Sequence, residues 1–218
     1  KKGLLQQLFA VLLSKNHDTS AELMELILRF LKKLSIYEEN KDIMKEMKII
    51  PLLMKFLTCN HDTIIKITLR LLFNLSFDKD CREQMLKNGY IPKLSQLLKI
   101  PKHRAKVLKL LYHLSVDDRC KSMITYTDAM PLLMEFVINI PEERLPGELA
   151  ALMINLSYYP KNCELMIQNR GLNLLMDRFN DKRDPLLMKI IRNISLWSFN
   201  QQQVNENTHS KFYFLSSI

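Results

Sequence analysis

The feature that most constrains the fold of this chain is a repeat of about forty residues. Serines that end short apolar stretches lie at Ser35, Ser76, Ser115, Ser157 and Ser195, and the successive separations are 41, 39, 42 and 38 residues. A second landmark lies 16 residues after each of the first four serines, at Pro51, Pro92, Pro131 and Asn173. Units of this length cannot bury their apolar faces alone, so they stack on their neighbours.

The composition narrows the fold class and excludes several kinds of site. Four glycines in 218 residues are too few for a Gly-rich phosphate loop, a dinucleotide fingerprint or a nucleophile elbow. No apolar run approaches the roughly 20 residues of a membrane-spanning helix, so we expect no membrane insertion. The start "KKGLLQQLFAVLLS" has neither an initiator Met nor a cleavage site for a signal peptide, and we expect a piece of a longer protein.

The period and the apolar patterning predict an all-α fold of armadillo repeats. We expect a right-handed superhelical solenoid of about five repeats over residues 1–196, with the first and last incomplete and with repeat ends near 35, 76, 115, 157 and 195. HEAT repeats have a similar period, but three helices per unit fit better. A short helix follows each serine, proline lies in the first turn of the second helix, and a long third helix ends at the next serine.

The starts of the third helices carry capping residues. "NHDT" occurs at Asn16–Thr19 and again at Asn60–Thr63, and Asp184 before Pro185 supplies an equivalent start. We interpret both copies of "NHDT" as helix caps and not as histidine sites.

Residues 197–218 depart from the repeat pattern. They are rich in Gln and Asn, then apolar, and they show no further repeat. We expect a divergent tail that is either disordered or the product of truncation, divergent splicing or a gene-model error. Because terminal repeats need a polar outer face, we also expect this chain alone to be less soluble than a longer one.

Asn74, Asn155 and Asn193 each begin an N-x-S sequence, the acceptor pattern for N-linked sugar. Glycosylation requires an accessible loop in a secreted protein. These asparagines instead occupy one repeat position near the end of an apolar helix, so we expect them to remain unmodified.

Polar residues recur at four-residue steps along each third helix, and such steps stay on one helix face. The series are Glu25, Arg29 and Lys33; Lys66, Arg70 and Asn74; Ala105, Lys109 and His113; Gly147, Ala151 and Asn155; Lys189 and Asn193. Stacked repeats would align them along a groove that holds an extended peptide. The candidate partner-binding residues are Arg29, Lys33, Lys66, Arg70, Asn74, Lys109, His113, Asn155, Lys189 and Asn193.

An alternative interpretation assigns these side chains no binding role. The asparagines would cap carbonyls of the neighbouring helix, and the cations would only keep an open face solvated. The recurrence of the pattern from repeat to repeat favours the groove.

The charge of the expected groove indicates the kind of partner. The chain carries a formal net charge of +9. Armadillo proteins resembling importin-α use acidic grooves in which a Trp lies one helical turn before the groove Asn. In this chain the positions of that Trp are occupied by Arg29, Arg70, Lys109, Ala151 and Lys189. A basic peptide would be repelled, so we expect acidic protein segments, as in the β-catenin manner of binding. Nucleic acid is a weaker alternative because the stripes offer few aromatic side chains for stacking.

No pattern for catalysis, metal binding or a cofactor is present in the sequence. Cys81, Cys120 and Cys163 fall at one position in successive repeats, where a spacing of about 8–10 Å exceeds the roughly 7 Å limit for a disulfide. We expect free thiols in a reducing compartment. There is no C-x-x-C, no histidine pair at metal spacing, and no nucleophile–histidine–acid arrangement, so we predict neither an enzyme nor a small-molecule site.

Four segments resemble a known family more specifically than the repeat period does. They are "FLKKLSIYEENK" (30–41), "ITLRLLFNLSFD" (67–78), "LYHLSVDDRCKSMITYTDAMPLLM" (111–134) and "DPLLMKIIRNIS" (184–195). Together they resemble the kinesin-associated protein family, the non-motor accessory subunit of heterotrimeric kinesin-II, over roughly residues 20–196. The resemblance implies an armadillo adaptor that binds kinesin-II motor tails and cargo adaptors. It also implies a role in intraflagellar transport and cilium assembly, and a cytoplasmic, cytoskeleton-associated location at the axoneme and basal body.

Overall fold

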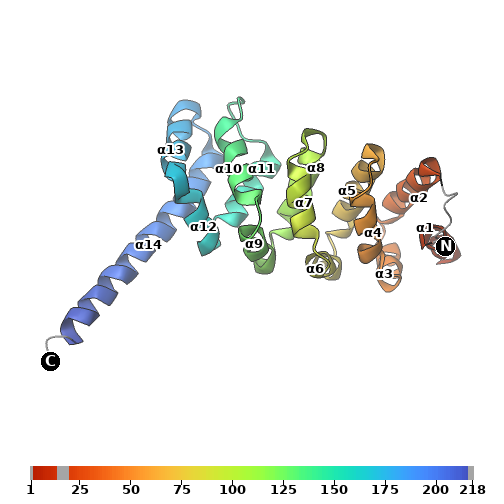
Figure 1. Ribbon diagram of the computed structural model, residues 1–218, viewed down its shortest axis with the longest axis horizontal. Helices are drawn as coiled ribbons and strands as arrows, with labels where there is room; N and C mark the ends of the chain where they lie inside the picture. The colour runs from red at the N-terminus through yellow and green to blue at the C-terminus, as the bar shows by residue number, and fades with distance from the viewer. Residues whose placement is uncertain (1, 14–19, 216–218) are drawn as a thin grey trace. The chain divides into compact units, whose positions relative to one another are not determined.

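The computed structural model describes residues 2–13 and 20–215, with side chains described for residues 3–13 and 20–201. Contacts divide the chain into two compact units, residues 1–120 and 121–218. All regular secondary structure in the described ranges is helical (Figure 1).

Unit 1 contains an incomplete repeat followed by complete ones. Its helices are α1 (Lys2–Leu13), α2 (Ala21–Leu34), α3 (Glu38–Glu46), α4 (Ile49–Leu57), α5 (Asp62–Leu75), α6 (Lys79–Lys87), α7 (Tyr90–Leu98) and α8 (Pro101–Leu114). A short helix, a second helix and a longer third helix follow one another as α3, α4 and α5, and again as α6, α7 and α8. The order of three helices per repeat predicted from the sequence is therefore confirmed, and α1 and α2 correspond to the second and third helices of the first repeat.

Unit 2 continues the same order after α9 (Asp118–Thr125), which spans the boundary between the units. Its helices are α10 (Ala129–Asn139), α11 (Gly147–Leu156), α12 (Pro160–Ile167), a 3-10 turn η1 (Gln168–Arg170), α13 (Gly171–Lys182) and α14 (Pro185–Leu215). Here α12 is the first helix of a repeat, α13 the second and α14 the third.

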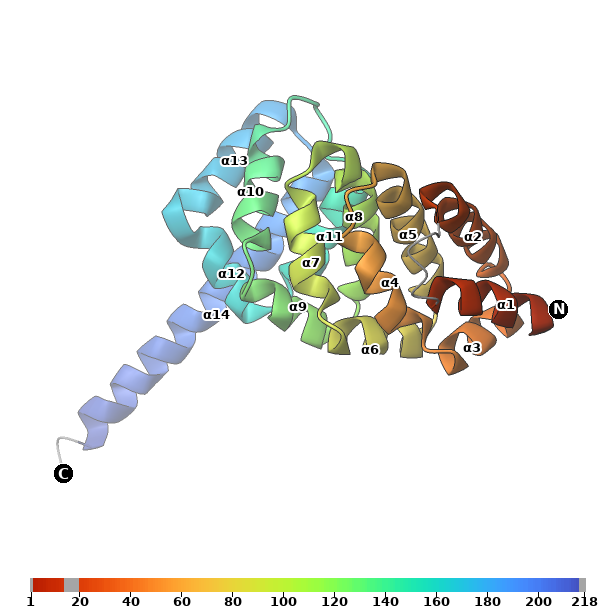
Figure 2. The same ribbon diagram turned by 45° about the vertical axis from the view of Figure 1, so that its right-hand side comes forward.

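The third helices are buried because their sequences are apolar around most of the circumference. Helix α5 buries eight side chains: Ile64, Ile65, Ile67, Thr68, Leu69, Leu71, Leu72 and Leu75. It packs between α2 on one side and α8 on the other (Figure 2). Only a narrow strip of α5 remains for solvent, and Lys66, Arg70 and Asn74 occupy it, as the four-residue spacing predicts.

The turns into three of the second helices contain a left-handed residue, whereas Asp128 before α10 has φ of -69°. Lys48, Gly89 and Arg170 precede α4, α7 and α13 with φ of 55°, 74° and 62°. Each second helix of unit 1 then begins two residues before its landmark proline, so Pro51 and Pro92 lie in the first turn, where the missing N–H breaks no intrahelical bond. This position of the landmark prolines matches the sequence prediction.

Two polar side chains organise the long connection between α10 and α11 in unit 2. Arg178 is 8% exposed, and its guanidinium donates to the carbonyls of Ile140 at 2.6 Å and Glu142 at 2.8 Å. Asp184 accepts from the backbone N–H of Leu145 at 2.7 Å and from that of Leu186 at 2.9 Å. Asp184 therefore caps α14, as expected, and also binds Leu145 in the connection before α11.

The "NHDT" prediction has a mixed outcome. Asn16–Thr19 lies outside the described residues, and α2 is capped instead by Ser20, whose side chain accepts from Leu23 N–H at 3.2 Å. The second copy lies at the start of α5, but the N-cap residue is His61 and its side chain makes no capping bond. The motif marks the helix start without supplying the expected side-chain cap, because Asp62 faces Lys102 and His103 of α8 instead.

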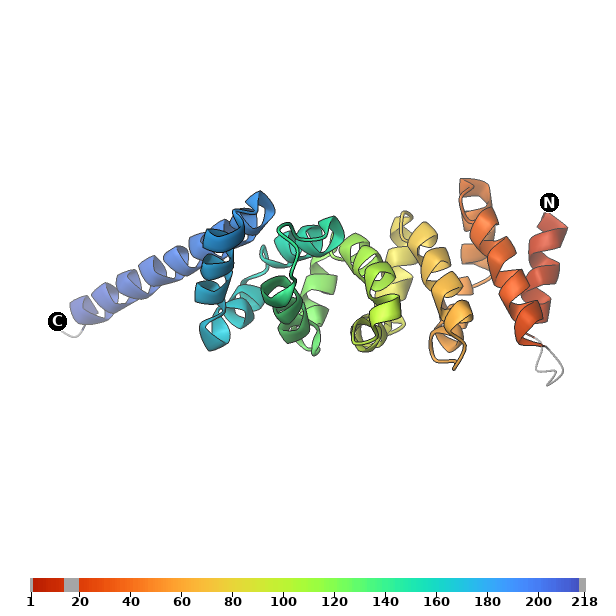
Figure 3. The ribbon, with the colours of Figure 1, turned by 90° about the horizontal axis from the view of Figure 1, so that it is seen from above.

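Helix α14 does not end at the repeat serine. It continues from Pro185 through Ser195 to Leu215, extending past the other helices of unit 2 (Figure 3). The backbone of residues 197–215 is thus helical, whereas the sequence offered disorder as one expectation. The proposed domain boundary at residue 196 stays a prediction. None of the described helices is both long and apolar enough to cross a membrane.

Candidate functional site

Five predicted partner-binding cations lie on the third helices of unit 1. Arg29 and Lys33 belong to α2, Lys66 and Arg70 to α5, and Lys109 to α8. All but Lys66 are exposed, and Lys66 is half-buried. Because α2, α5 and α8 pack in succession, these side chains share one surface, which we call the cation face.

Three of the predicted amide and histidine positions, Asn74, His113 and Asn193, make hydrogen bonds between repeats. Asn74 Nδ2 donates to Ser35 Oγ at 3.0 Å and to the Lys32 carbonyl at 3.0 Å. His113 Nδ1 lies 3.0 Å from Ser76 Oγ. In unit 2, Asn193 Nδ2 donates to Ser157 Oγ at 2.8 Å. We call these pairs, Asn74–Ser35, His113–Ser76 and Asn193–Ser157, the serine clasps, because each joins a third helix to the end of the preceding third helix.

The serines are oriented by their own helices. Each hydroxyl donates to the carbonyl three residues earlier: Ser35 to Lys32 at 2.8 Å, Ser76 to Phe73 at 2.7 Å, Ser115 to Tyr112 at 2.7 Å and Ser157 to Ile154 at 2.7 Å. A hydroxyl has one hydrogen, so its oxygen is left as an acceptor for the next repeat. This geometry explains why serine recurs at the ends of α2, α5, α8 and α11.

The Asn74 amide nitrogen caps a carbonyl of the neighbouring helix, as the alternative interpretation expects. Both hydrogens of Asn74 Nδ2 are used by the preceding repeat, and a peptide could be offered only the carbonyl oxygen. Whether these residues bind a partner stays a prediction. Asn155, on α11, is half-buried, and Lys189, on α14, is exposed.

The same logic assigns the tautomer of His113. Since the Ser76 hydroxyl donates to Phe73, its oxygen must accept from His113, and Nδ1 must carry a hydrogen. The ring packs against Phe73 and Phe77, with centroid distances of 4.6 and 4.5 Å. Burial and the Arg82 guanidinium lower the pKa of His113, which favours the neutral ring at neutral pH.

A cavity of about 310 Å³ opens on the cation face between α5 and α8. Its lining is Leu69, Arg70, Phe73, Ala105, Lys106 and Lys109. Burial, and then the charges of Arg70, Lys66 and Lys109, lower the pKa of Lys106. The floor is apolar and the walls are cationic, so the cavity suits an anion attached to an apolar group.

Ion pairs distinguish two cations of this cavity, Arg70 and Lys106, from two other cations of unit 1. Arg29 is bound by Glu25 of its own helix at 2.5 Å, and Lys45 is bound by Asp42 and Asp78 at 2.9 Å each. Among the described residues, no salt bridge is made by Arg70 or Lys106. Their charges are therefore available to a partner.

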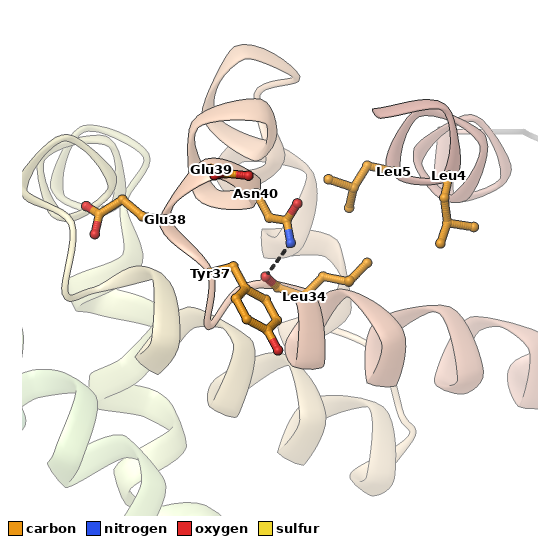
Figure 4. Close-up of a pocket in the computed structure, with 7 residues that line it drawn as sticks. All are labelled: Leu4, Leu5, Leu34, Tyr37, Glu38, Glu39 and Asn40. Carbon is orange, nitrogen blue, oxygen red and sulfur yellow. Dashed lines mark hydrogen bonds between the residues drawn. The ribbon is translucent and has the colours of Figure 1, made fainter. Parts of the chain in front are cut away.

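A second cavity, of about 550 Å³, lies where α1, α2 and α3 of unit 1 meet. Its lining is Leu4, Leu5, Leu34, Tyr37, Glu38, Glu39 and Asn40 (Figure 4). The Asn40 amide nitrogen donates to the Leu34 carbonyl at 3.0 Å. With two carboxylates at its edge, this cavity has the opposite sign to that on the cation face.

Sequence reasoning missed a recurring apolar residue directly after each repeat serine. These residues are exposed by 67% at Ile36, 61% at Phe77, 66% at Val116, 67% at Tyr158 and 51% at Leu196. The signal was present as the residue that follows "LS" or "IS" in every repeat. Large apolar side chains that remain exposed at one repeat position are unexpected for surface filling alone.

The cysteines are free thiols, as the spacing predicts. Cys81, Cys120 and Cys163 are buried and Cys59 is half-buried. Burial, followed by the charge of Asp78, raises the pKa of Cys81 to about 12, and burial raises that of Cys163 to about 11. Thiols held in this state are poor nucleophiles. Within the described ranges, no cluster of His, Cys, Asp and Glu could hold a metal ion.

Comparison with known proteins supplies the family and the fold. The family model described as kinesin-associated protein matches residues 2–208. U-box domain-containing protein 45 from Arabidopsis thaliana is 25% identical over 168 residues, which is 72% of this chain and 22% of that protein. The chain thus spans about a fifth of the length of this curated relative.

Two solved structures are similar to the chain in fold. A designed armadillo repeat protein in complex with the peptide (KR)4 has a TM-score of 0.71 at 13% identity, with 89% of this chain and 82% of that chain covered. The armadillo repeats only protein from Plasmodium falciparum has a TM-score of 0.70 at 16% identity, with 90% and 92% covered. These similarities confirm the predicted fold class, an all-α armadillo-repeat solenoid.

Proposed function

Because the chain belongs to the kinesin-associated protein family, we propose that it is a non-catalytic adaptor that binds the tails of kinesin-II motor subunits and links them to cargo. An armadillo solenoid is a protein-binding scaffold, and the family associates with kinesin by its description. The proposal extends to cargo adaptors as partners and to intraflagellar transport and cilium assembly. It places the protein in the cytoplasm, on the cytoskeleton, at the axoneme and at the basal body.

The cation face of unit 1 is the observation that supports binding of acidic partner segments. Arg70 and Lys109 stand on adjacent third helices beside an apolar cavity. A surface of this sign attracts acidic segments and repels basic ones. The designed armadillo protein solved with (KR)4 holds a basic peptide, and we propose the reverse charge preference for this chain.

A pull-down of kinesin-II motor tail fragments tests this mode. We expect Arg70→Glu with Lys109→Glu to weaken capture of acidic tail fragments at least about tenfold and to flatten the dependence on salt. The matched control is Lys79→Glu with Lys87→Glu on α6, which makes the same change in net charge at exposed positions away from the cation face. Unchanged capture would remove the cation face from the mechanism and leave the family assignment standing.

Nucleic-acid binding is the second candidate, favoured by the net charge of +9. Phosphate binding falls steeply between about 50 and about 200 mM salt. Homopolymer RNA measured at both salt concentrations, beside the acidic tail fragments, separates the candidates. Tighter binding of RNA than of tail fragments at the higher salt would favour this second function.

A further inference from the structure

The cavity on the cation face is continuous with an exposed aromatic cluster. Phe73 lines the cavity, and its ring lies 5.4 Å from that of Phe77. Phe77 in turn lies edge-on to His113 at 4.5 Å, and Tyr112 packs against His113 at 5.7 Å. Cationic and aromatic surfaces therefore meet at Phe73.

Phe77 is open to solvent although it has aromatic neighbours. Its side chain is 61% exposed, and that of Tyr112 is 36% exposed. A Phe held in a fixed position by edge-to-face contacts loses little conformational entropy when a second apolar group covers it. This arrangement is typical of a pre-organised apolar contact site.

The α5–α8 pair differs from the preceding pair of third helices in the pairing of its central arginine. The preceding pair, α2 and α5, also carries an exposed apolar residue after its serine, Ile36. There, however, the cation equivalent to Arg70 is Arg29, and Glu25 neutralises it. At α5–α8, in contrast, Arg70 makes no salt bridge within the described residues, and it lines the cavity that Phe73 joins to Phe77.

We propose that the surface between α5 and α8 binds a partner segment in which acidic residues and an aromatic residue are separated by about three positions. Seven steps along the chain separate Arg70 from Phe77, which lies two residues beyond the end of α5 at Leu75, and a helical rise of about 1.5 Å per step corresponds to about 10 Å. An extended peptide covers this length in about three residues. The carboxylates would meet Arg70 and Lys106, and the aromatic ring would cover Phe77.

This inference rests on the proposed use of the cation face for acidic segments, and it adds the apolar requirement. The probes are fluorescently labelled synthetic peptides. One peptide carries two glutamates three positions before a phenylalanine, and a second carries the same residues in reverse order. Each has a matched peptide with serine in place of the phenylalanine. Their affinities are measured by fluorescence anisotropy with the full chain. Circular dichroism confirms that each variant is folded.

Of the two phenylalanine peptides, the one that binds more tightly should lose about tenfold in affinity in the Phe77→Ser variant. The affinity of its matched serine peptide should not change. Arg70→Glu should weaken both peptides. Ile36→Ser is the matched control, an equally exposed apolar residue at the same repeat position, and should change neither affinity.

The other possible outcomes separate the apolar requirement from the proposed binding of acidic segments. If Phe77→Ser leaves the aromatic peptide unaffected while Arg70→Glu weakens it, the apolar requirement is wrong and the acidic mode stands. If neither substitution matters, or if no peptide binds at large excess, both the inference and the acidic mode on this face are wrong.

Discussion

At the scale of single residues, His113 shows how one side chain can replace another in a repeated contact. It occupies the position of Asn74 and Asn193, and its Nδ1–H gives Ser76 the hydrogen bond that their amides give Ser35 and Ser157. Asparagine could therefore replace it without loss of the clasp. The ring also packs on Phe73 and Phe77, a contact that an amide makes less well.

We predict that His113→Asn costs less than about 1 kcal/mol in the free energy of unfolding, whereas His113→Ala costs about 1–2 kcal/mol. The alanine variant leaves the Ser76 oxygen without its donor and removes the aromatic packing. Urea unfolding followed by circular dichroism measures both. Equal losses for the two variants would show that the hydrogen bond contributes nothing.

The histidines also predict how stability varies with pH. Burial is the main cause that lowers the pKa of His103 and of His113. Between these folded values and the unfolded value of about 6.5, the unfolded chain binds more protons, so the free energy of unfolding falls as the pH drops through this window. Unfolding at about pH 7.5 and about pH 5.5 should show the decrease, and His113→Asn should reduce it. A stability that rises on acidification in this window would contradict both shifts.

Thiol reactivity can be predicted from burial at the same scale. Cys59 is half-buried, whereas Cys81, Cys120 and Cys163 are buried, and burial raises the pKa of Cys81 and of Cys163. We expect a maleimide to modify Cys59 first in the folded protein and the other three only in denaturant. Mass spectrometry of the labelled peptides gives the order, and early modification of Cys81 would show that α6 opens readily.

At the scale of helices, Asp78 connects two successive repeats. It caps α6 by accepting from Cys81 N–H at 2.8 Å, and it binds Lys45 of α3 at 2.9 Å. The hydrogen bond from Lys45 to Asp78 is the main cause that raises the pKa of that lysine. One carboxylate thus serves both as a helix cap and as a contact between first helices.

We predict that Asp78→Ala lowers the free energy of unfolding by about 1–2 kcal/mol, from the lost cap and the lost ion pair together. Asp80→Ala is the matched control, because Asp80 is exposed and lies 3.7 Å from Lys45 without capping the helix. Urea unfolding measures the two variants side by side, and equal effects would mean that the cap at α6 is unimportant.

The helices were also the most predictable feature of the sequence. Serine and proline fix the ends of second and third helices through the hydrogen bonds they make or cannot make, so the repeat order followed from the spacing alone. The contacts between repeats did not follow, because Asn74 could equally have faced a peptide or the preceding helix. The hydrogen bond from the Asn74 amide nitrogen to Ser35 Oγ, seen only in the structure, shows that this side chain faces the preceding helix.

The cavity could not be predicted from the sequence, because its lining comes from α5 and α8 together. The pairing of Arg29 could have been predicted, because Glu25 lies four residues before it on the same helix, where Arg70 has Lys66. The uninterrupted course of α14 past Ser195 was also not predicted, because residues 197–218 show no repeat pattern, although Gln in particular is compatible with a helix.

At the scale of the whole molecule, the chain consists of two units that can be probed separately. Trp197, the one tryptophan, lies in unit 2, and its fluorescence reports unfolding there. Repeat proteins couple mainly between neighbouring repeats. A substitution deep in unit 1 should therefore change local stability without an equal change around Trp197.

We predict that Asp78→Ala accelerates amide hydrogen exchange in α3 and α6 and shifts the urea midpoint of Trp197 fluorescence much less than that of circular dichroism. The converse variant is Gly171→Ala in unit 2, where an added Cβ would lie 2.0 Å from the Met166 carbonyl oxygen. It should shift the tryptophan midpoint and leave exchange in α3 unchanged. Identical shifts by both probes would show that the chain unfolds as a single cooperative unit.

The continuous course of α14 through Ser195 limits how a further repeat could pack against this end of unit 2. At Ser35, Ser76 and Ser157 the helix stops, and its hydroxyl is ready to receive a donor from the adjoining triplet. At Ser195 the backbone instead stays helical, so the chain does not turn there toward a next triplet. Adding one more triplet in register would require α14 to unwind locally at Ser195, so growth of the array and persistence of the long rod exclude each other.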